Sequence, residues 1–134
     1  MFRLAVLPFA VVGILAVSSL QAQDAKETKK AQITLKLLDK KASVDFKETR
    51  LQEIIDELKD HAKGLRIQID AKGGVSQNRK LSFSGKDVTI NKILEGLLKK
   101  EGLGYGVISN EKDAYDGSVY IKVGGELGGV IRKR

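Results

Sequence analysis

The chain has 134 residues, no cysteine, one histidine and a formal net charge of +7. Without cysteine it can hold neither a disulfide framework nor a thiolate metal site, and a lipid-modified cysteine behind an export signal is also excluded. Residues 42–131 hold 14 basic and 14 acidic side chains, so the positive charge lies at the two ends, which argues against a nucleic-acid-binding face built into the folded body.

The N-terminal segment has the order of a secretory signal peptide. Arg3 precedes an apolar run from Leu4 to Val17, and small and polar residues follow up to Ala22. This run is shorter than the roughly 20 residues that cross a bilayer as a helix. We therefore expect residues 1–22 to be removed, leaving a periplasmic or secreted protein with no transmembrane segment, with an uncleaved anchor as the alternative.

Residues 23–42 are predicted to be a charged linker. "QDAKETKK", residues 23–30, is polar and has no apolar period. "QITLKLL", residues 32–38, alternates Ile33, Leu35 and Leu37 with polar residues, which is the period of a half-buried strand. The same residues are compatible with the start of a short helix, so an extra strand and a helix both stay open.

Residues 44–70, "VDFKETRLQEIIDELKDHAKGLRIQID", predict a strand, an amphipathic helix and a second strand. Thr49 stands where a helix N-cap belongs, and Gln52 can complete a capping box. The helix ends at Gly64, and its apolar stripe consists of Leu51, Ile54, Ile55 and Leu58. The next strand alternates Leu65, Ile67 and Ile69.

Residues 81–109, "LSFSGKDVTINKILEGLLKKEGLGYGVIS", repeat this plan. Thr89 can cap a second helix, and Gly102 can end it. The intervals are 37 residues from Phe46 to Phe83, 39 from Ile54 to Ile93, and 38 from Gly64 to Gly102. The stripe of the second helix consists of Ile90, Ile93, Leu94, Leu97 and Leu98.

The C-terminal part predicts a hairpin and a tail. Residues 110–117 end in Asp-Gly, a turn signal, and "SVYIKVG" reads as the returning strand. Residues 125–134 are expected to be a flexible, glycine-rich, basic tail. Because two amphipathic helices need sheet surface on which to bury their stripes, the fold class is α+β: a small βαββαββ sandwich with two helices packed on short mixed sheets.

No candidate catalytic, cofactor-binding or metal-binding residues emerge, so we expect a protein that is not an enzyme. His61 has no second histidine or cysteine with which to bind a metal ion. "GLGYG", residues 102–106, follows a helix, whereas a phosphate-binding loop must precede one. Asp113 and Asp116 lack the spacing of a calcium loop, and the acidic residues of the first helix suit a solvated face.

Residues 43–123 resemble the secretin and TonB short N-terminal (STN) domain. The matching segments are "VDFKETRLQEIIDEL", "GLRIQID", "LSFSGKDVTINKILEGLLKKEGLGY" and the closing strand. The resemblance implies a βαββαββ fold in residues 43–124 and a non-enzymatic role in periplasmic protein contacts. Gating and siderophore transport are not carried over, because no plug, barrel or secretin core follows Arg134 in this sequence.

We therefore expect an exported protein-binding or adaptor module of the cell envelope, with the partner's identity and self-association left open. The expected docking surface is the edge of the closing strand, at Val119, Tyr120, Ile121 and Lys122. The alternative is a polyanion-binding envelope protein that uses its two basic arms rather than a nucleic-acid fold. The arm residues are Lys29, Lys30, Lys40, Lys41, Arg132, Lys133 and Arg134.

Export is tested by the mass of the protein recovered from the cell that makes it. Because the order of charge, apolar run and small residues matches a cleaved signal, the intact mass should lack about the first 22 residues. Recovery of the full-length chain from the cytoplasm would contradict export.

Overall fold

The structure, a computed structural model, describes residues 26–134. The predicted signal peptide, residues 1–22, lies outside the described residues. The elements in chain order are α2 (Lys29–Leu37), β1 (Lys41–Arg50), α3 (Leu51–His61), β2 (Ile67–Ile69), β3 (Lys80–Thr89), α4 (Ile90–Lys99), β4 (Leu103–Ile108), β5 (Val119–Val123) and β6 (Leu127–Ile131).

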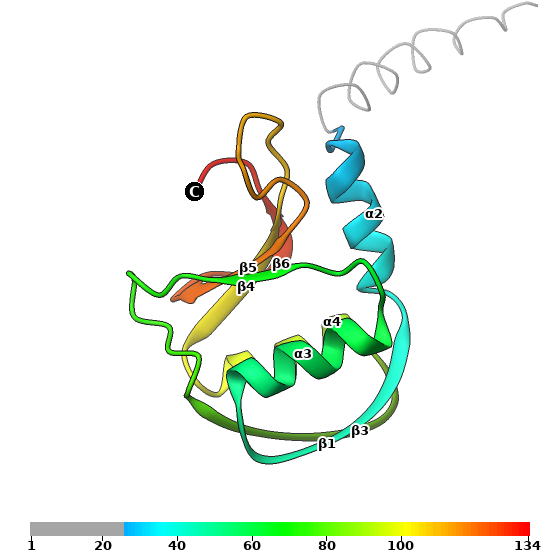
Figure 1. Cartoon of the computed structure of the whole chain (residues 1–134), viewed down its shortest axis with the longest axis vertical. Helices are drawn as coiled ribbons and strands as arrows, with labels where there is room; N and C mark the ends of the chain where they lie inside the picture. Colours follow the sequence, from blue (N-terminus) through cyan, green and yellow to red (C-terminus); the bar gives the residue numbers. More distant parts are fainter. Residues whose placement is uncertain (1–25) are drawn as a thin grey trace, which may run out of the picture.

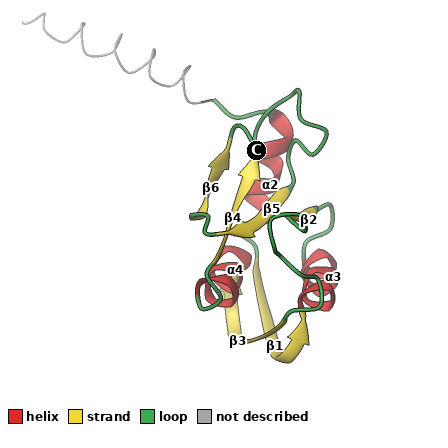
Figure 2. Cartoon of the chain, turned by 90° about the vertical axis from the view of Figure 1, so that its left-hand side faces the viewer, coloured by secondary structure: helices red, strands yellow, loops and turns green. Residues whose placement is uncertain are grey.

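The predicted α+β class is confirmed. From β1 to β5 the order is βαββαββ, with α2 added before it and β6 after it. β1 and β3 form a two-stranded antiparallel sheet, here called the ribbon, and the other strands form a mixed sheet in the order β2-β5-β4-β6. Figure 2 shows α3 and α4 between the ribbon and the four-stranded sheet. Both helices therefore bury their stripes against two layers.

The repeated unit is visible as a local two-fold arrangement of the ribbon. The Glu48 amide donates to Ser82 Oγ at 2.9 Å, and the Asp87 amide donates to Ser43 Oγ at 2.9 Å. Glu48 and Asp87 both have positive φ, 45° and 55°, at breaks in the strand register. Ser43 and Ser82 are 39 residues apart, and so are Glu48 and Asp87. Each half therefore contains an equivalent bulge and an equivalent serine, and each serine accepts the hydrogen bond of the bulge amide in the other half.

One of the predicted repeat pairs is wrong. Phe46 and Phe83 do not occupy equivalent positions; they face each other across the ribbon. The 39-residue interval holds in the ribbon and the helices, as Ile54 and Ile93 predicted. After the helices the interval becomes 38, as Gly64 and Gly102 predicted.

The two helix starts differ in how their first amides are satisfied. Thr89 is the N-cap of α4, as predicted, and its hydroxyl accepts from the Lys92 amide at 3.2 Å. The predicted Thr49 cap of α3 is wrong: the N-cap position is Arg50, whose side chain makes no capping hydrogen bond. Backbone carbonyls replace it, because Leu51 N donates to Arg79 O and Gln52 N to Gln77 O.

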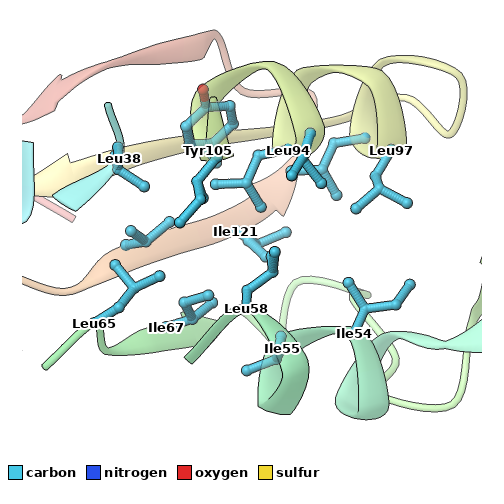
Figure 3. Packing of buried hydrophobic residues seen from close by; sticks show 14 of the residues in the cluster. Leu38, Ile54, Ile55, Leu58, Leu65, Ile67, Leu94, Leu97, Tyr105 and Ile121 are labelled. Carbon is cyan, nitrogen blue, oxygen red and sulfur yellow. The ribbon is translucent and has the colours of Figure 1, made fainter. Parts of the chain in front are cut away.

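The core lies between the layers. Figure 3 shows Ile121 of β5 between Leu58 of α3 and Leu94 of α4. Each fully buried aliphatic side chain of this kind contributes about 1.5–3 kcal/mol relative to exposure. The Tyr105 hydroxyl donates to Asn91 Oδ1 at 2.8 Å, and burial, with a smaller effect of the Glu95 carboxylate, raises the pKa of Tyr105 to about 12. Tyr105 is thus a neutral core residue.

The linker predicted at residues 23–42 is wrong over its described part, which forms α2 and the start of β1. Of the two readings left open for residues 32–38, the helix is found. Its buried residues are Ala31 and Thr34, while Ile33 is exposed, so the alternation of Ile33, Leu35 and Leu37 did not mark the buried face. Thr28 caps α2 through its hydroxyl, which accepts from Ala31 N at 3.1 Å.

The flexible tail predicted at residues 125–134 is also wrong, because residues 127–131 form β6 parallel to β4. β5 and β6 lie on opposite sides of β4, so the short connection between them crosses the start of β4. A Cβ at Gly104 would lie 2.2 Å from the Gly125 carbonyl, so the crossing requires glycine at 104. The sheet thereby gains a fourth strand that the predicted hairpin did not include.

Replacing Gly104 by alanine should cost about 3 kcal/mol of unfolding free energy, because the new methyl group meets backbone that cannot rotate away. Gly102→Ala is the matched control: its φ of +72° brings strain of about 1 kcal/mol, but nothing lies within 4 Å of the added Cβ. Urea denaturation of both variants measures the difference. Equal losses would show that residues 124–126 do not cross β4 closely.

Candidate functional site

The described residues offer no grouping suited to metal binding. Within residues 26–134 no cluster of three or more histidine, aspartate or glutamate side chains is placed to hold an ion. His61 Nε2 lies 3.7 Å from Glu57 Oε2 on the outer side of α3. The Gly102–Gly106 stretch runs from the end of α4 into β4, so a strand and not a helix follows it. Binding surfaces are therefore the features to compare.

The docking edge predicted at Val119, Tyr120, Ile121 and Lys122 is not an edge. β5 pairs with β2 in parallel and with β4 in antiparallel fashion, so both sides of its backbone are used. Val119 and Ile121 are fully buried, whereas Tyr120 and Lys122 alternate onto the opposite face of the sheet. The prediction failed because it gave the closing strand one neighbour, and the chain supplies two.

The edges of the four-stranded sheet are β2 and β6. β6 is irregular, since Gly128 and Gly129 have φ values of +96° and +91° and the register with β4 shifts there. The ribbon strands each contain a bulge, at Glu48 and Asp87. Such irregularities make an edge a poor template for another strand. β2, "IQI", is short but regular, with no lysine or proline.

Hydrogen bonds fix which way the β2 backbone faces. Val119 N donates to Arg66 O at 2.8 Å, and Asp70 N donates to Ile121 O at 2.9 Å. In a parallel ladder the groups of alternate residues point to opposite sides, so the N–H and C=O groups of Ile67 and Ile69 point away from β5. No strand of residues 26–134 pairs with that side.

A groove of about 600 Å³ adjoins this edge. Its wall opposite Ile69 is the segment that carries the chain from the sheet toward the ribbon. The lining residues are Ile69, Ala71, Gly74, Val75, Ser76, Gln77 and Asn78. Small residues keep the groove open, and exposed polar side chains at 76–78 offer hydrogen-bonding groups. Sequence reasoning missed this site, although the unpatterned stretch "AKGGVSQNR" between two predicted strands marked its position.

The β4 side of the sheet shows what the β2 side lacks. At the 38-residue interval, Ile67 and Ile69 correspond to Tyr105 and Val107. On β4 the corresponding outward groups hold β6: Tyr105 N donates to Glu126 O at 2.8 Å, and Val107 is paired with Val130. The same fold position is thus paired in the second half of the chain and open in the first.

The two C-terminal arginines, Arg132 and Arg134, are held by acidic partners. Arg134 Nε and Nη2 donate to the Asp113 carboxylate at 2.7 and 3.0 Å, and the guanidinium lies 5.0 Å from the Tyr115 ring centroid and 5.7 Å from that of Tyr120. The Arg134 hydrogen bond lowers the pKa of Asp113. Arg132 pairs with Glu27 at 2.9 Å.

The four predicted basic lysines lie on or beside α2, and Arg132 is paired near the start of this helix. Arg132 meets Glu27 just before α2, where Lys29 and Lys30 begin the helix, while Lys40 and Lys41 follow its other end. Lys133 is exposed between its two ion-paired neighbours. The positive charge that could bind a polyanion is therefore concentrated along α2 and its flanking residues rather than in two joined arms.

Comparisons of the chain with protein-family models, with curated proteins and with solved structures find no match. Among the described residues, no helix has the length and apolar character needed to cross a membrane.

The Asp113–Arg134 pair predicts a pH effect. A carboxyl whose pKa is lower in the folded state than its usual 3.8 stabilises the fold above that value, and this contribution is lost as the pH falls through the folded-state pKa. Asp113→Asn should therefore flatten the loss of melting temperature between about pH 5 and about pH 2. Asp60→Asn, at an exposed position of α3, is the control. Equal flattening by both variants would contradict a specific role of the pair.

Proposed function

We propose that this chain is an exported, non-enzymatic protein-binding module of the cell envelope, and that the β2 edge receives an extended segment of its partner. The observation that carries the proposal is the open outer side of β2 beside the groove, at the position where β4 binds β6. A strand added to a sheet edge gains main-chain hydrogen bonds, while neighbouring pockets select its side chains.

The groove defines the kind of segment that fits. The partly exposed Ile69 offers apolar contact, and the exposed Ser76, Gln77 and Asn78 offer polar contact. An extended segment that alternates apolar and polar residues matches both. By analogy with β6 on β4, it would run parallel to β2.

Two further observations support this role. The βαββαββ order of β1 to β5 is the order that the STN resemblance implies for a module of periplasmic protein contacts. The N-terminal sequence has the features of an export signal.

Site-specific photo-crosslinking in the native envelope tests the site. A photoreactive residue in place of Gln77, which is exposed in the groove, should give a discrete protein adduct. The same residue in place of Ser84, exposed on the ribbon, should not. Ala71→Arg should reduce the Gln77 adduct roughly tenfold by filling the groove, and Ala114→Arg, at an exposed position of the 110–117 turn, should leave it unchanged.

Equal adducts from positions 77 and 84, or an adduct that survives Ala71→Arg, would contradict docking at β2. Circular dichroism of each variant verifies that the fold is kept.

A further inference from the structure

The outward face of α2 combines lysines with one exposed isoleucine. The helix sequence "KKAQITLKL" contains no acidic residue. Ala31 and Thr34 are buried against the domain, whereas Ile33 is 61% exposed, one of the most exposed large apolar side chains of residues 26–134. At 100° per residue, Lys29 and Lys36 lie on one flank of Ile33 and Lys30 on the other, each within about 60° of it.

The flanking residues extend this basic surface. Lys26 precedes the helix, Lys40 and Lys41 follow it, and all six lysines of residues 26–41 are exposed. The acidic residues of the same segment are engaged by the domain: Glu27 pairs with Arg132 at 2.9 Å, and Asp39 Oδ1 accepts from Asn91 Nδ2 at 3.3 Å.

The helix is fixed to the domain rather than hinged. Thr28 Oγ1 donates to Asp116 Oδ1 at 2.8 Å, Thr28 N donates to Ser109 Oγ at 3.0 Å, and Thr34 Oγ1 donates to Gly117 O. Figures 1 and 2 place α2 at the end of the molecule opposite the ribbon. Figure 1 shows the α2 axis running along the long axis of the molecule, so a surface that binds the length of α2 would lie along one side of the domain.

We propose that the outward face of α2 binds the surface of an anionic lipid bilayer, with the lysines on lipid phosphates and Ile33 in the headgroup region. Lysines on a polar face around an apolar side chain are the composition of helices that lie in this interface. A soluble polyanion would use the lysines equally well, but it offers nothing to an exposed isoleucine. This inference does not depend on the β2 docking site.

Vesicle co-sedimentation of the full chain, as recovered from the envelope, tests whether the α2 lysines bind anionic lipid. Binding should be measurable to phosphatidylcholine vesicles containing about one third phosphatidylglycerol, negligible to pure phosphatidylcholine, and weaker at high salt. The triple variant Lys29→Gln, Lys30→Gln, Lys36→Gln should lose roughly fivefold affinity per lysine, on the order of a hundredfold in all.

The matched control removes three exposed lysines elsewhere: Lys47→Gln and Lys86→Gln on the ribbon and Lys99→Gln on α4. Its net charge equals that of the α2 variant, and its affinity should fall only a few-fold. Equal losses in the two triple variants, or equal binding to both kinds of vesicle, would overturn the proposal.

Fluorescence tests the role of Ile33. The chain contains no tryptophan, so Ile33→Trp introduces a single reporter, whose emission should move to shorter wavelength with anionic vesicles. Val123→Trp, at an apolar position that is 52% exposed on β5, is the control and should not shift.

Ile33→Ser separates a membrane from a soluble polyanion. It should weaken vesicle binding several-fold and leave binding to heparin unchanged, since its charge is that of the original chain. An unshifted reporter at position 33, or an equal loss of heparin and vesicle binding, would overturn insertion and favour a soluble polyanion.

Discussion

The antiparallel pairing of β1 with β3 is the constraint on which the rest of the structure depends. Each ribbon strand runs into its helix without a loop, from Arg50 to Leu51 and from Thr89 to Ile90. The register of the ribbon therefore sets where both helices start and which of their faces turn inward. With α3 and α4 held on one side of the ribbon, their remaining apolar surface needs a second layer, and the four-stranded sheet provides it.

Local patterns in the sequence were sufficient for the elements that this constraint controls. The stripes of α3 and α4 and the Thr89 cap follow from spacing and hydroxyl chemistry within a few residues. Thr49 carried the same local signal and failed, because carbonyls of residues 77 and 79 already satisfy the first amides of α3. A capping rule reads only neighbours in sequence and cannot see an acceptor about 25 residues away.

The candidate site was unpredictable for a related reason. Which strand is an edge depends on the whole sheet order, and here the glycine-rich tail decided it. Residues 125–134 read as flexible because glycine lowers strand propensity, yet glycine at position 104 is what permits the crossing that brings β6 to β4. β5 is interior because β2 and β4 pair with its two sides, and once β6 covers β4, β2 is left as the regular edge. The strand pattern of residues 118–123 was correct, whereas its position in the sheet was not a local property.

The segments added at the two ends of the βαββαββ unit, α2 and β6, make the surfaces of its two similar halves different. β6 covers the outer side of β4, but no described strand covers the corresponding side of β2. α2 likewise covers the end of the sheet beside residues 109–117, fixed there by Thr28 and Thr34, and presents a basic outer face. A doubled unit alone would offer two similar surfaces. Because β6 pairs with β4 and α2 is bound at residues 109–117, an open strand edge and a lysine-rich helix occupy different parts of the domain. A partner at β2 and a surface at α2 would therefore not compete for the same residues.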